Sequence, residues 1–190
     1  SDEKPTHLVT LSDYYIGETE VTQALWQAVM ENNPSSFTGK YNPVECVSWN
    51  DCQEFIRKLN SLTGRTFRLP TEAEWEFAAR GGNESKGYKY SGSNSIDNVA
   101  WCAGNYSYKT HAVKTKSPNE LGIYDMSGNV NEWCQDWYGS YSSNAQTNPK
   151  GPLSYSYRVL RGGGWYNDAR RCRVSYRGNN FPDYRSYFGL

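Results

Sequence analysis

Hydrophobic residues in the first part of the chain recur at helical spacing. Thr22, a residue type that often caps helices, precedes Leu25, Trp26 and Val29, which share one helical face. Before this segment, apolar and polar positions alternate over residues 8–16 as they do in a half-buried strand. The pattern therefore predicts a strand over residues 8–16 and a helix that begins after Thr22.

Two more helices carry start signals of their own. Ser48 and Asp51 have the spacing of a capping box, and Gly64 provides a stop for the helix between them. Thr71 and Glu74 form a second capping box, which opens a short helix through residue 79. The buried faces of these helices are expected to contain Cys52, Phe55, Ile56 and Leu59 in the first, and Trp75 and Ala78 in the second.

From residue 83 onward the composition changes. Gly, Ser, Asn and Tyr dominate, hydrophobic runs become short, and Trp101, Trp133, Trp137 and Trp165 recur at intervals. A disordered tail would be poor in aromatic residues, whereas this chain is 15% aromatic. No apolar run approaches the roughly 20 residues of a transmembrane helix. The pattern predicts a single domain over residues 1–190, with short strands and few helices joined by long ordered loops.

Charge and metal-ligand composition narrow the functions further. Lys and Arg total 20, as do Asp and Glu, so no basic field points to nucleic acid. The five cysteines leave at least one unpaired within a monomer, and no CxxC motif suggests zinc. Two histidines are too few for a multi-histidine metal centre. Because the chain opens without Met, we expect a processed or trimmed amino terminus.

Five segments together resemble one known family. They are residues 20–22, 43–51, 68–82, 122–133 and 158–165, with RLPTEAEWEFAARGG as the longest match. This order of motifs is similar to that of the formylglycine-generating-enzyme (sulfatase-modifying-factor) domain, and the match covers nearly the whole chain. The resemblance implies an α+β fold that is a variant of the C-type lectin-like fold. It also implies that a further Gly-rich strand usually precedes the position of Ser1.

The resemblance does not extend to the catalytic cysteines. Active members oxidise a substrate cysteine with oxygen, using copper(I) on two cysteines five positions apart, shortly after a Gly-Gly-Ser turn. Here the turn is Gly162–Gly164 and only Cys172 follows it, while Asn131 replaces an aromatic residue. A second thiol would have to come from Cys102 or Cys134. We therefore expect no copper and no catalysis, with a sulfatase-modifying oxidoreductase or an inactive relative as the alternative.

A calcium site is a further implication of the resemblance. It would use the carboxylates of Asp125 and Glu132 with the carbonyl groups of Gly128 and Val130. Hard oxygen ligands from a Gly-containing loop suit Ca²⁺. In the alternative interpretation, Asp125 caps a turn and Glu132 pairs with an arginine.

The tail, residues 165–190, has an unusual composition. After Trp165 it contains no Lys, Glu, Gln, Met or Trp, the five residue types that codons ending in C or T cannot encode. Residues with structural roles are expected at Ala169, Cys172, Val174, Pro182 and Gly189, with Trp165 just before them. Fourteen other residues of the tail are Asn or are reached from an Asn codon by changing its first two bases. They are Tyr166, Asn167, Asp168, Arg170, Arg171, Tyr176, Gly178, Asn179, Asn180, Phe181, Tyr184, Ser186, Tyr187 and Phe188.

This pattern resembles the variable region of proteins diversified by retroelements, which use the same lectin-type subfamily. The resemblance implies a fixed scaffold with a mutable receptor surface. Tyr, Asn, Ser, Arg and Gly suit recognition, and Arg170, Arg171, Arg177 and Arg185 lie near the aromatic residues in sequence. An ordinary tail whose aromatic residues pack on the core remains an alternative, and a strip that binds single-stranded nucleic acid is another.

These observations together predict a non-catalytic domain that binds a protein or glycan through its carboxy-terminal face. A cell-surface or secreted location is favoured over a cytoplasmic one. The ligand, the oligomeric state and the pairing of the cysteines remain open.

Overall fold

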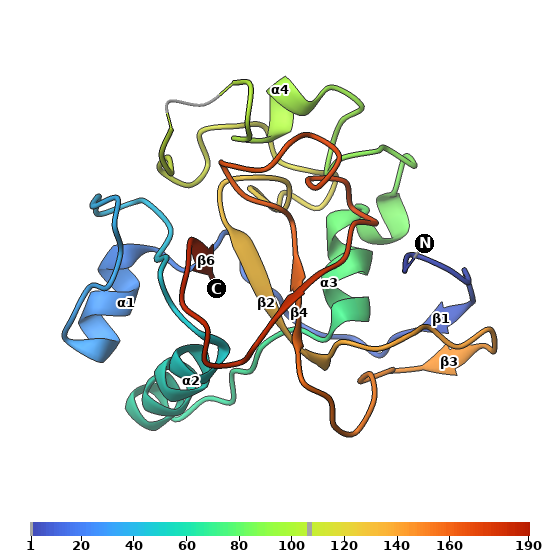
Figure 1. Ribbon diagram of the computed structural model, residues 1–190, viewed down its shortest axis with the longest axis horizontal. Helices are drawn as coiled ribbons and strands as arrows, with labels where there is room; N and C mark the ends of the chain where they lie inside the picture. The colour runs from blue at the N-terminus through green and yellow to red at the C-terminus, as the bar shows by residue number, and fades with distance from the viewer. Residues whose placement is uncertain (1, 106–107) are drawn as a thin grey trace.

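The computed structural model describes residues 2–105 and 108–190 of the chain. Most of the chain forms ordered loops between short elements (Figure 1). The helical elements are α1 (Gln23–Met30), α2 (Trp49–Thr63), α3 (Glu72–Ala79), the 3₁₀ turn η1 (Gly82–Glu84) and α4 (Ile96–Val99). The strands are β1 (Val9–Thr10), β2 (Asn131–Trp137), β3 (Gln146–Thr147), β4 (Arg158–Arg161), β5 (Gly178–Asn180) and β6 (Phe188–Gly189).

The three predicted helices begin where their capping residues stand. The hydroxyl of Thr22 accepts from the backbone of α1. Ser48 with Asp51 and Thr71 with Glu74 both form complete capping boxes, in which each side chain satisfies a free amide of the other residue. The α2 helix ends at Gly64, which adopts the left-handed conformation. These predictions are confirmed because each depends only on neighbouring residues.

The strand predicted over residues 8–16 is wrong in its length. Only β1, Val9–Thr10, pairs with another strand, the parallel β3. Tyr14 lies beyond it and donates its hydroxyl to the carbonyl of Glu74, while Tyr15 is fully exposed. The alternation of polar and apolar residues correctly predicts that Val9, Leu11 and Ile16 are less exposed than their polar neighbours, but Leu8 is exposed. The alternation does not predict a ladder, which needs a partner strand that this segment lacks after residue 10.

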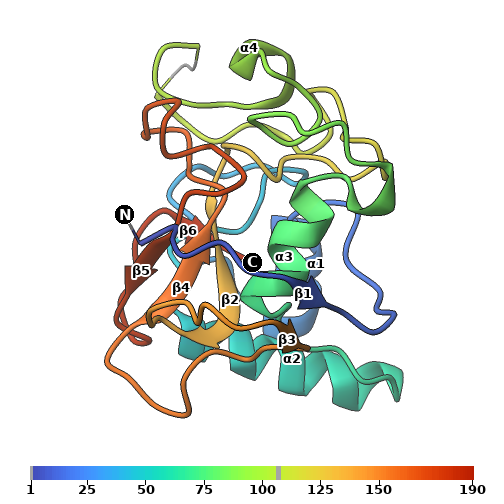
Figure 2. The same cartoon turned by 90° about the vertical axis from the view of Figure 1, so that its right-hand side faces the viewer.

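A four-stranded sheet forms the centre of the molecule. Its strand order is β5-β4-β2-β6, with β2 and β4 antiparallel, β4 and β5 antiparallel, and β2 and β6 parallel. The two views show α3 lying against β2 and β4, and α2 crossing the end of β2 (Figures 1 and 2). Because β5 and β6 are the two edges of this sheet, the tail supplies both of its outer strands.

Two apolar clusters fix the helices to this sheet. In the first, Trp26 of α1 stacks on Phe55 of α2, with ring centroids 4.9 Å apart, and Trp133 of β2 meets Phe188 edge-on. In the second, Trp75 of α3 packs with buried residues of β2 and β4. Each large aromatic ring buries much apolar area. A few such rings therefore form a hydrophobic core although the helices and strands of this chain are short.

Candidate ligand-binding face

The tail lies on one side of the molecule. It runs across the front of Figure 1 and along the left edge of Figure 2, so the two views agree on one face. Residues 182–185 are fixed to α2, because Asn50 donates its backbone N–H to Pro182 and Arg185 pairs with Asp51 at 2.7 Å. This anchoring turns the tail into a defined surface.

Twelve of the fourteen candidate positions are at least partly open to solvent. Seven are exposed: Tyr166, Asp168, Arg170, Arg171, Asn179, Phe181 and Tyr184. Five are half-buried: Tyr176, Gly178, Asn180, Ser186 and Tyr187. Of the five residues expected to have structural roles, Cys172, Val174 and Gly189 are buried, whereas Ala169 and Pro182 are half-buried. The structure thus separates the outward positions from the residues that hold the tail on the core.

Two of the fourteen side chains do not face solvent. Asn167 is 7% exposed, and its amide oxygen accepts from Gly164 N and from Asn131 Nδ2. Phe188, also 7% exposed, packs on Trp133. Asn167 therefore holds a turn and Phe188 belongs to the core, which is what the alternative of an ordinary tail predicts for these two positions.

Arg177 also differs from its expected place beside three other arginines on the surface. It is 4% exposed and donates to both carboxylate oxygens of Glu72 at 2.7 Å. A buried guanidinium group with these partners is not available to a ligand. The surface arginines of the tail are Arg170, Arg171 and Arg185.

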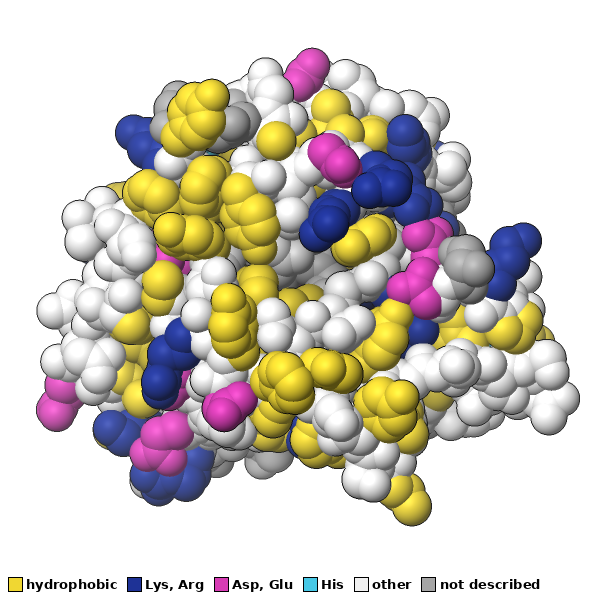
Figure 3. Space-filling view, viewed as in Figure 1, with side chains coloured by type: hydrophobic (Ala, Val, Ile, Leu, Met, Phe, Trp, Pro, Cys, Tyr) yellow, Lys and Arg dark blue, Asp and Glu magenta, His cyan; other side chains and the backbone are white. Residues whose placement is uncertain are grey.

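Aromatic rings gather at the centre of the face. The ring centroid of Trp165 lies 5.2 Å from that of Tyr187, 5.4 Å from that of Tyr166 and 5.3 Å from that of Phe37, and all three contacts are edge-on. The hydroxyl of Tyr166 accepts from the side-chain amide of Asn131 at 2.8 Å. Hydrophobic side chains are visible over this side of the molecule (Figure 3). Phe37, from the loop after α1, joins the tail here and was not identified from the sequence.

The segment predicted to bind calcium brings acidic side chains into the interior. Asp125 is buried, with positive φ, and one of its carboxylate oxygens accepts from the backbone N–H of Lys114 at 2.9 Å. Its other oxygen has no hydrogen-bond partner among the described residues. Glu132 accepts from the indole N–H of Trp75 at 2.9 Å rather than pairing with an arginine. Burial raises the pKa of Asp125 to about 6 and that of Glu132 to about 7.

A third carboxylate lies nearby that sequence reasoning missed. Glu20 accepts from the backbone N–H of Val130 at 3.1 Å and from the side chain of Asn129 at 2.7 Å. Burial, and then the charges of Asp125 and Glu132, raise its pKa well above the ordinary value. In residues 2–105 and 108–190, no three His, Cys, Asp or Glu side chains converge as metal ligands. A calcium site here would therefore need the carbonyl groups of Gly128 and Val130.

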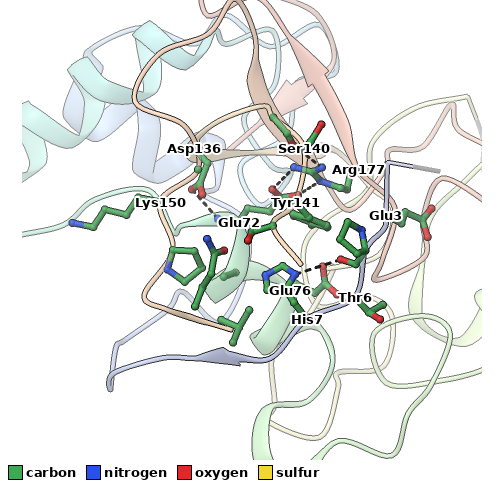
Figure 4. A pocket seen from close by; sticks show the side chains of 18 of the residues that line it. Glu3, Thr6, His7, Glu72, Glu76, Asp136, Ser140, Tyr141, Lys150 and Arg177 are labelled. Carbon is green, nitrogen blue, oxygen red and sulfur yellow. Dashed lines mark hydrogen bonds and ion pairs between the residues drawn. The ribbon is translucent and has the colours of Figure 1, made fainter. Parts of the chain in front are cut away.

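A separate pocket of about 790 Å³ lies between the amino-terminal segment, α3 and the loops flanking β3 (Figure 4). Glu72, Arg177, Asp136 and Tyr141 line it. Asp136 accepts from the backbone N–H of Glu72 at 2.9 Å. Burial and, to a smaller extent, the nearby charges of Glu72 and Glu74 raise the pKa of Asp136 to about 7. Sequence reasoning missed this pocket, whose walls come from distant segments.

Replacing Asp136 with asparagine is expected to stabilise the protein at pH 8. Wild-type Asp136 stays protonated in the folded state up to about pH 7, whereas it ionises near pH 4 when unfolded. Wild-type stability is therefore lost as the pH rises from about 4 to 7. Asparagine keeps the acceptor for Glu72 and removes this cost, so thermal unfolding at pH 8 should show a gain of about 1–2 kcal/mol. The gain should disappear at pH 4, and a gain independent of pH would contradict this explanation.

Comparison with known proteins identifies the family. The profile of the sulfatase-modifying factor enzyme 1-like (FGE-sulfatase) domain matches residues 1–189. The chain belongs to this family. It is 36% identical over 220 residues to chaperone protein LppX of Paenibacillus barcinonensis, covering 90% of this chain and 75% of that protein. It is 36% identical over 172 residues to the formylglycine-generating enzyme of Streptomyces coelicolor, covering 80% of this chain but only 52% of that enzyme.

A solved structure also matches nearly the whole of this sulfatase-modifying-factor domain. Treponema denticola variable protein 1 superimposes with a TM-score of 0.89 at 39% identity, covering 97% of this chain and 85% of that one. The predicted fold class, an α+β fold of the formylglycine-generating-enzyme type, is confirmed. The resemblance to variable proteins is confirmed as well.

Of the two cysteines named as sources of a second thiol, Cys102 shares a buried apolar cluster with Cys172, whereas Cys134 belongs to another cluster. Cys102 comes from the loop after α4 and Cys172 from the tail. The family's paired cysteines lie five positions apart, whereas these two are distant in sequence and meet only through folding. Both are buried, so neither sulfur is open to a substrate peptide. No helix in the described part of the chain is long and apolar enough to span a membrane.

Proposed function

We propose that this domain is a non-catalytic receptor domain that binds a protein or glycan through its tail. One observation supports this most directly. Twelve of the fourteen candidate variable positions are at least partly open to solvent, while Cys172, Val174 and Gly189, three of the five expected structural positions, are buried. Such a surface tolerates substitution at the outward positions, because they contribute little to the core. A tail that served only packing would not separate the two classes in this way.

The chemistry of the face suits recognition. Trp165, Tyr166 and Tyr187 form an aromatic centre, and Arg170 and Arg171 lie in the exposed turn that follows it. Rigid aromatic rings and arginines are the residues that most often dominate binding energy at protein interfaces. Tyrosine and asparagine also offer hydrogen bonds to sugars or peptide groups. The proposal includes a cell-surface or extracellular location, where such a face meets foreign ligands.

The proposal also includes a structural calcium ion. Asp125 and Glu132 would supply carboxylate oxygens, and Gly128 and Val130 would supply carbonyl oxygens. The unpartnered buried oxygen of Asp125 supports this assignment, because a buried carboxylate without a donor or cation is costly. The ion would fix the loop before β2. It would thereby also fix Asn131, whose side-chain amide donates to the hydroxyl of Tyr166.

The sulfatase-modifying oxidoreductase is the second candidate. The shared position of Cys102 and Cys172 in one buried cluster favours it, since two sulfurs are what copper(I) requires. Incubation with copper, oxygen and a sulfatase-derived cysteine peptide tests it, with formylglycine detected by mass spectrometry. Formation of that product would overturn the receptor assignment. We expect none, because both thiols are covered by the fold.

Comparison of the coding locus among isolates tests the receptor function directly. We expect substitutions concentrated in the fourteen candidate codons, with a nearby template copy, and most frequent at the twelve solvent-accessible positions. Tyr184→Asn, at an exposed position, should change the free energy of unfolding by less than about 0.5 kcal/mol. Phe188→Asn, the matched buried control, should destabilise the fold clearly. Substitutions spread evenly over residues 1–190 would contradict the proposal.

A further inference from the structure

Two cysteines, one of them in the tail, lie side by side in a buried cluster at the base of the candidate binding face. Cys102 follows α4 and Cys172 lies within the tail, and they are 2% and 0% exposed. They belong to one apolar cluster with Tyr90 and Val99. The Cys102 thiol donates to the carbonyl of Ala103 at 3.8 Å, and both side chains are packed in this one cluster. The fold therefore brings together two sulfurs from segments far apart in the sequence.

The backbone around both cysteines is fixed. Ala103 donates its N–H to the carbonyl of Asn167 at 2.8 Å, which joins the two segments next to the thiols. The hydroxyl of Ser127 donates to the carbonyl of Cys172 at 2.8 Å. A Cβ atom added at Gly163 would lie 2.9 Å from the Cys172 sulfur, so the turn presses against that side chain. These contacts leave the sulfurs little freedom to separate.

The other cysteines have different surroundings. Cys46 donates to a carboxylate oxygen of Glu45 at 3.0 Å and contacts the hydroxyl of Ser36. Cys52 and Cys134 are buried in the two apolar clusters beside the sheet. Among the described cysteines, Cys102 and Cys172 are thus the two that share one buried cluster.

We propose that Cys102 and Cys172 form a disulfide bond by exchange with a small disulfide such as oxidised glutathione. The Cys102 thiolate attacks one glutathione sulfur and releases the first glutathione thiolate. The Cys172 thiolate then attacks the Cys102 sulfur of the mixed disulfide and releases the second. Two protein thiols are oxidised and one glutathione disulfide is reduced to two glutathione molecules, which take up the two protons.

The acidity of the pair is consistent with this order of attack. The neighbouring Cys172 thiol lowers the pKa of Cys102, while the pKa of Cys172 is raised well above its usual value. A more acidic thiol is more often in the reactive thiolate form. Because both sulfurs are covered, exchange takes place during folding or through local opening of the tail.

The bond would cross-link the base of the candidate binding face to the loop after α4. It closes a loop of about 70 residues, which restricts the unfolded chain strongly. It would also hold the exposed turn around Arg170 and Arg171 in one arrangement. The cross-link would form whether or not the face binds a ligand.

Mass spectrometry of the intact chain tests the cross-link. The protein is refolded in oxidised or reduced glutathione, unfolded, alkylated with iodoacetamide and digested. We expect a linked peptide that contains Cys102 and Cys172 only in the oxidised sample, and its loss after treatment with dithiothreitol. The melting temperature should be about 5–15 °C higher in the oxidised sample.

Single variants separate the cross-link from other effects of oxidation. Cys102→Ser should abolish the difference in melting temperature between oxidised and reduced samples. Cys46→Ser, which alters the most accessible cysteine, should retain it. Alkylation of both Cys102 and Cys172 in the oxidised wild-type sample would overturn the proposal. An equal shift in Cys102→Ser and wild type would overturn it as well, and neither result requires Cys172→Ser to fold.

Discussion

Replacing Glu72 with glutamine is expected to lower the free energy of unfolding by about 3–5 kcal/mol. The substitution keeps the size of the side chain and removes its charge. For a chain of this length, the melting temperature should fall by about 6–20 °C. Since typical domains are stable by only about 5–15 kcal/mol, this loss is a large fraction of the total.

The reason is that Glu72 neutralises two buried guanidinium groups. It pairs with Arg161, which is 0% exposed, and with Arg177, each at 2.7 Å. Glu76 provides a further partner for Arg161, but that carboxylate also binds Arg80 and is partly open to solvent. In Glu72→Gln, Arg177 retains only uncharged acceptors, which are the amide oxygen at position 72 and the carbonyl groups of residues 2 and 139. A buried cation without a carboxylate is far costlier than the loss of an exposed pair.

The pH dependence of the same variant provides a second readout. Burial alone raises the pKa of Glu72, but the charges of Arg161 and Arg177 outweigh it, so the net pKa is lowered. A lowered folded-state pKa contributes stability above the unfolded pKa of about 4.5, and this contribution is lost as the pH falls through the folded value. The difference between wild type and Glu72→Gln should therefore shrink in acid.

Thermal unfolding followed by circular dichroism at pH 7 and pH 3 measures both effects. Glu54→Gln is the matched control, because Glu54 pairs with Arg57 on the exposed face of α2. Its melting temperature should equal that of wild type. If Glu72→Gln also melts at the wild-type temperature at pH 7, the buried ion pairs do not stabilise the fold.

The parts of the fold that sequence predicted well depend on short-range chemistry. The capping pairs Ser48–Asp51 and Thr71–Glu74 are three residues apart, so the hydrogen bonds that start each helix are visible in the sequence. The strand predicted over residues 8–16 is too long because only Val9 and Thr10 pair with a partner, β3, which lies far away along the chain. Pairing between distant segments leaves no local signal in a single sequence.

The candidate face shows the same division. The composition of the tail correctly separates most outward positions from inward ones such as Val174. It does not distinguish Asn167 and Phe188, because Asn and Phe are equally consistent with an exposed loop and with a buried contact. Likewise the pairing of Arg177 with Glu72 spans 105 residues, and only the folded arrangement reveals it.

The proximity of Cys102 to Cys172 and the position of Glu20 depend on folding too. Motif spacing directs attention to pairs of cysteines close in sequence, which these are not. Glu20 lies 110 residues before Val130, whose backbone N–H it accepts. A buried carboxylate is unusual enough to mark a functional position, but the sequence gives no indication that Glu20 is buried.

Calcium is expected to raise the melting temperature of the wild-type protein by about 5–10 °C, when a calcium concentration about 100 times the dissociation constant is compared with excess EGTA. Without the ion, Asp125 is a buried acidic group beside the half-buried Glu132, and the nearby buried Glu20 adds to the unfavourable charge. An ion held by Asp125, Glu132 and two carbonyl groups would offset this cost. Differential scanning calorimetry with a calcium titration measures the shift.

Asp125→Asn tests whether the shift arises at this site. Asparagine tolerates the positive φ of 61° at this position and keeps an acceptor for the backbone of Lys114. Calcium should then have little effect on the melting temperature, while the variant in EGTA should be at least as stable as wild type, because one buried charge is gone. Asp183→Asn, at an exposed position of the tail, should keep the full calcium response. An absent response in wild type, or an equal one in Asp125→Asn, would mean that these carboxylates serve the fold without an ion.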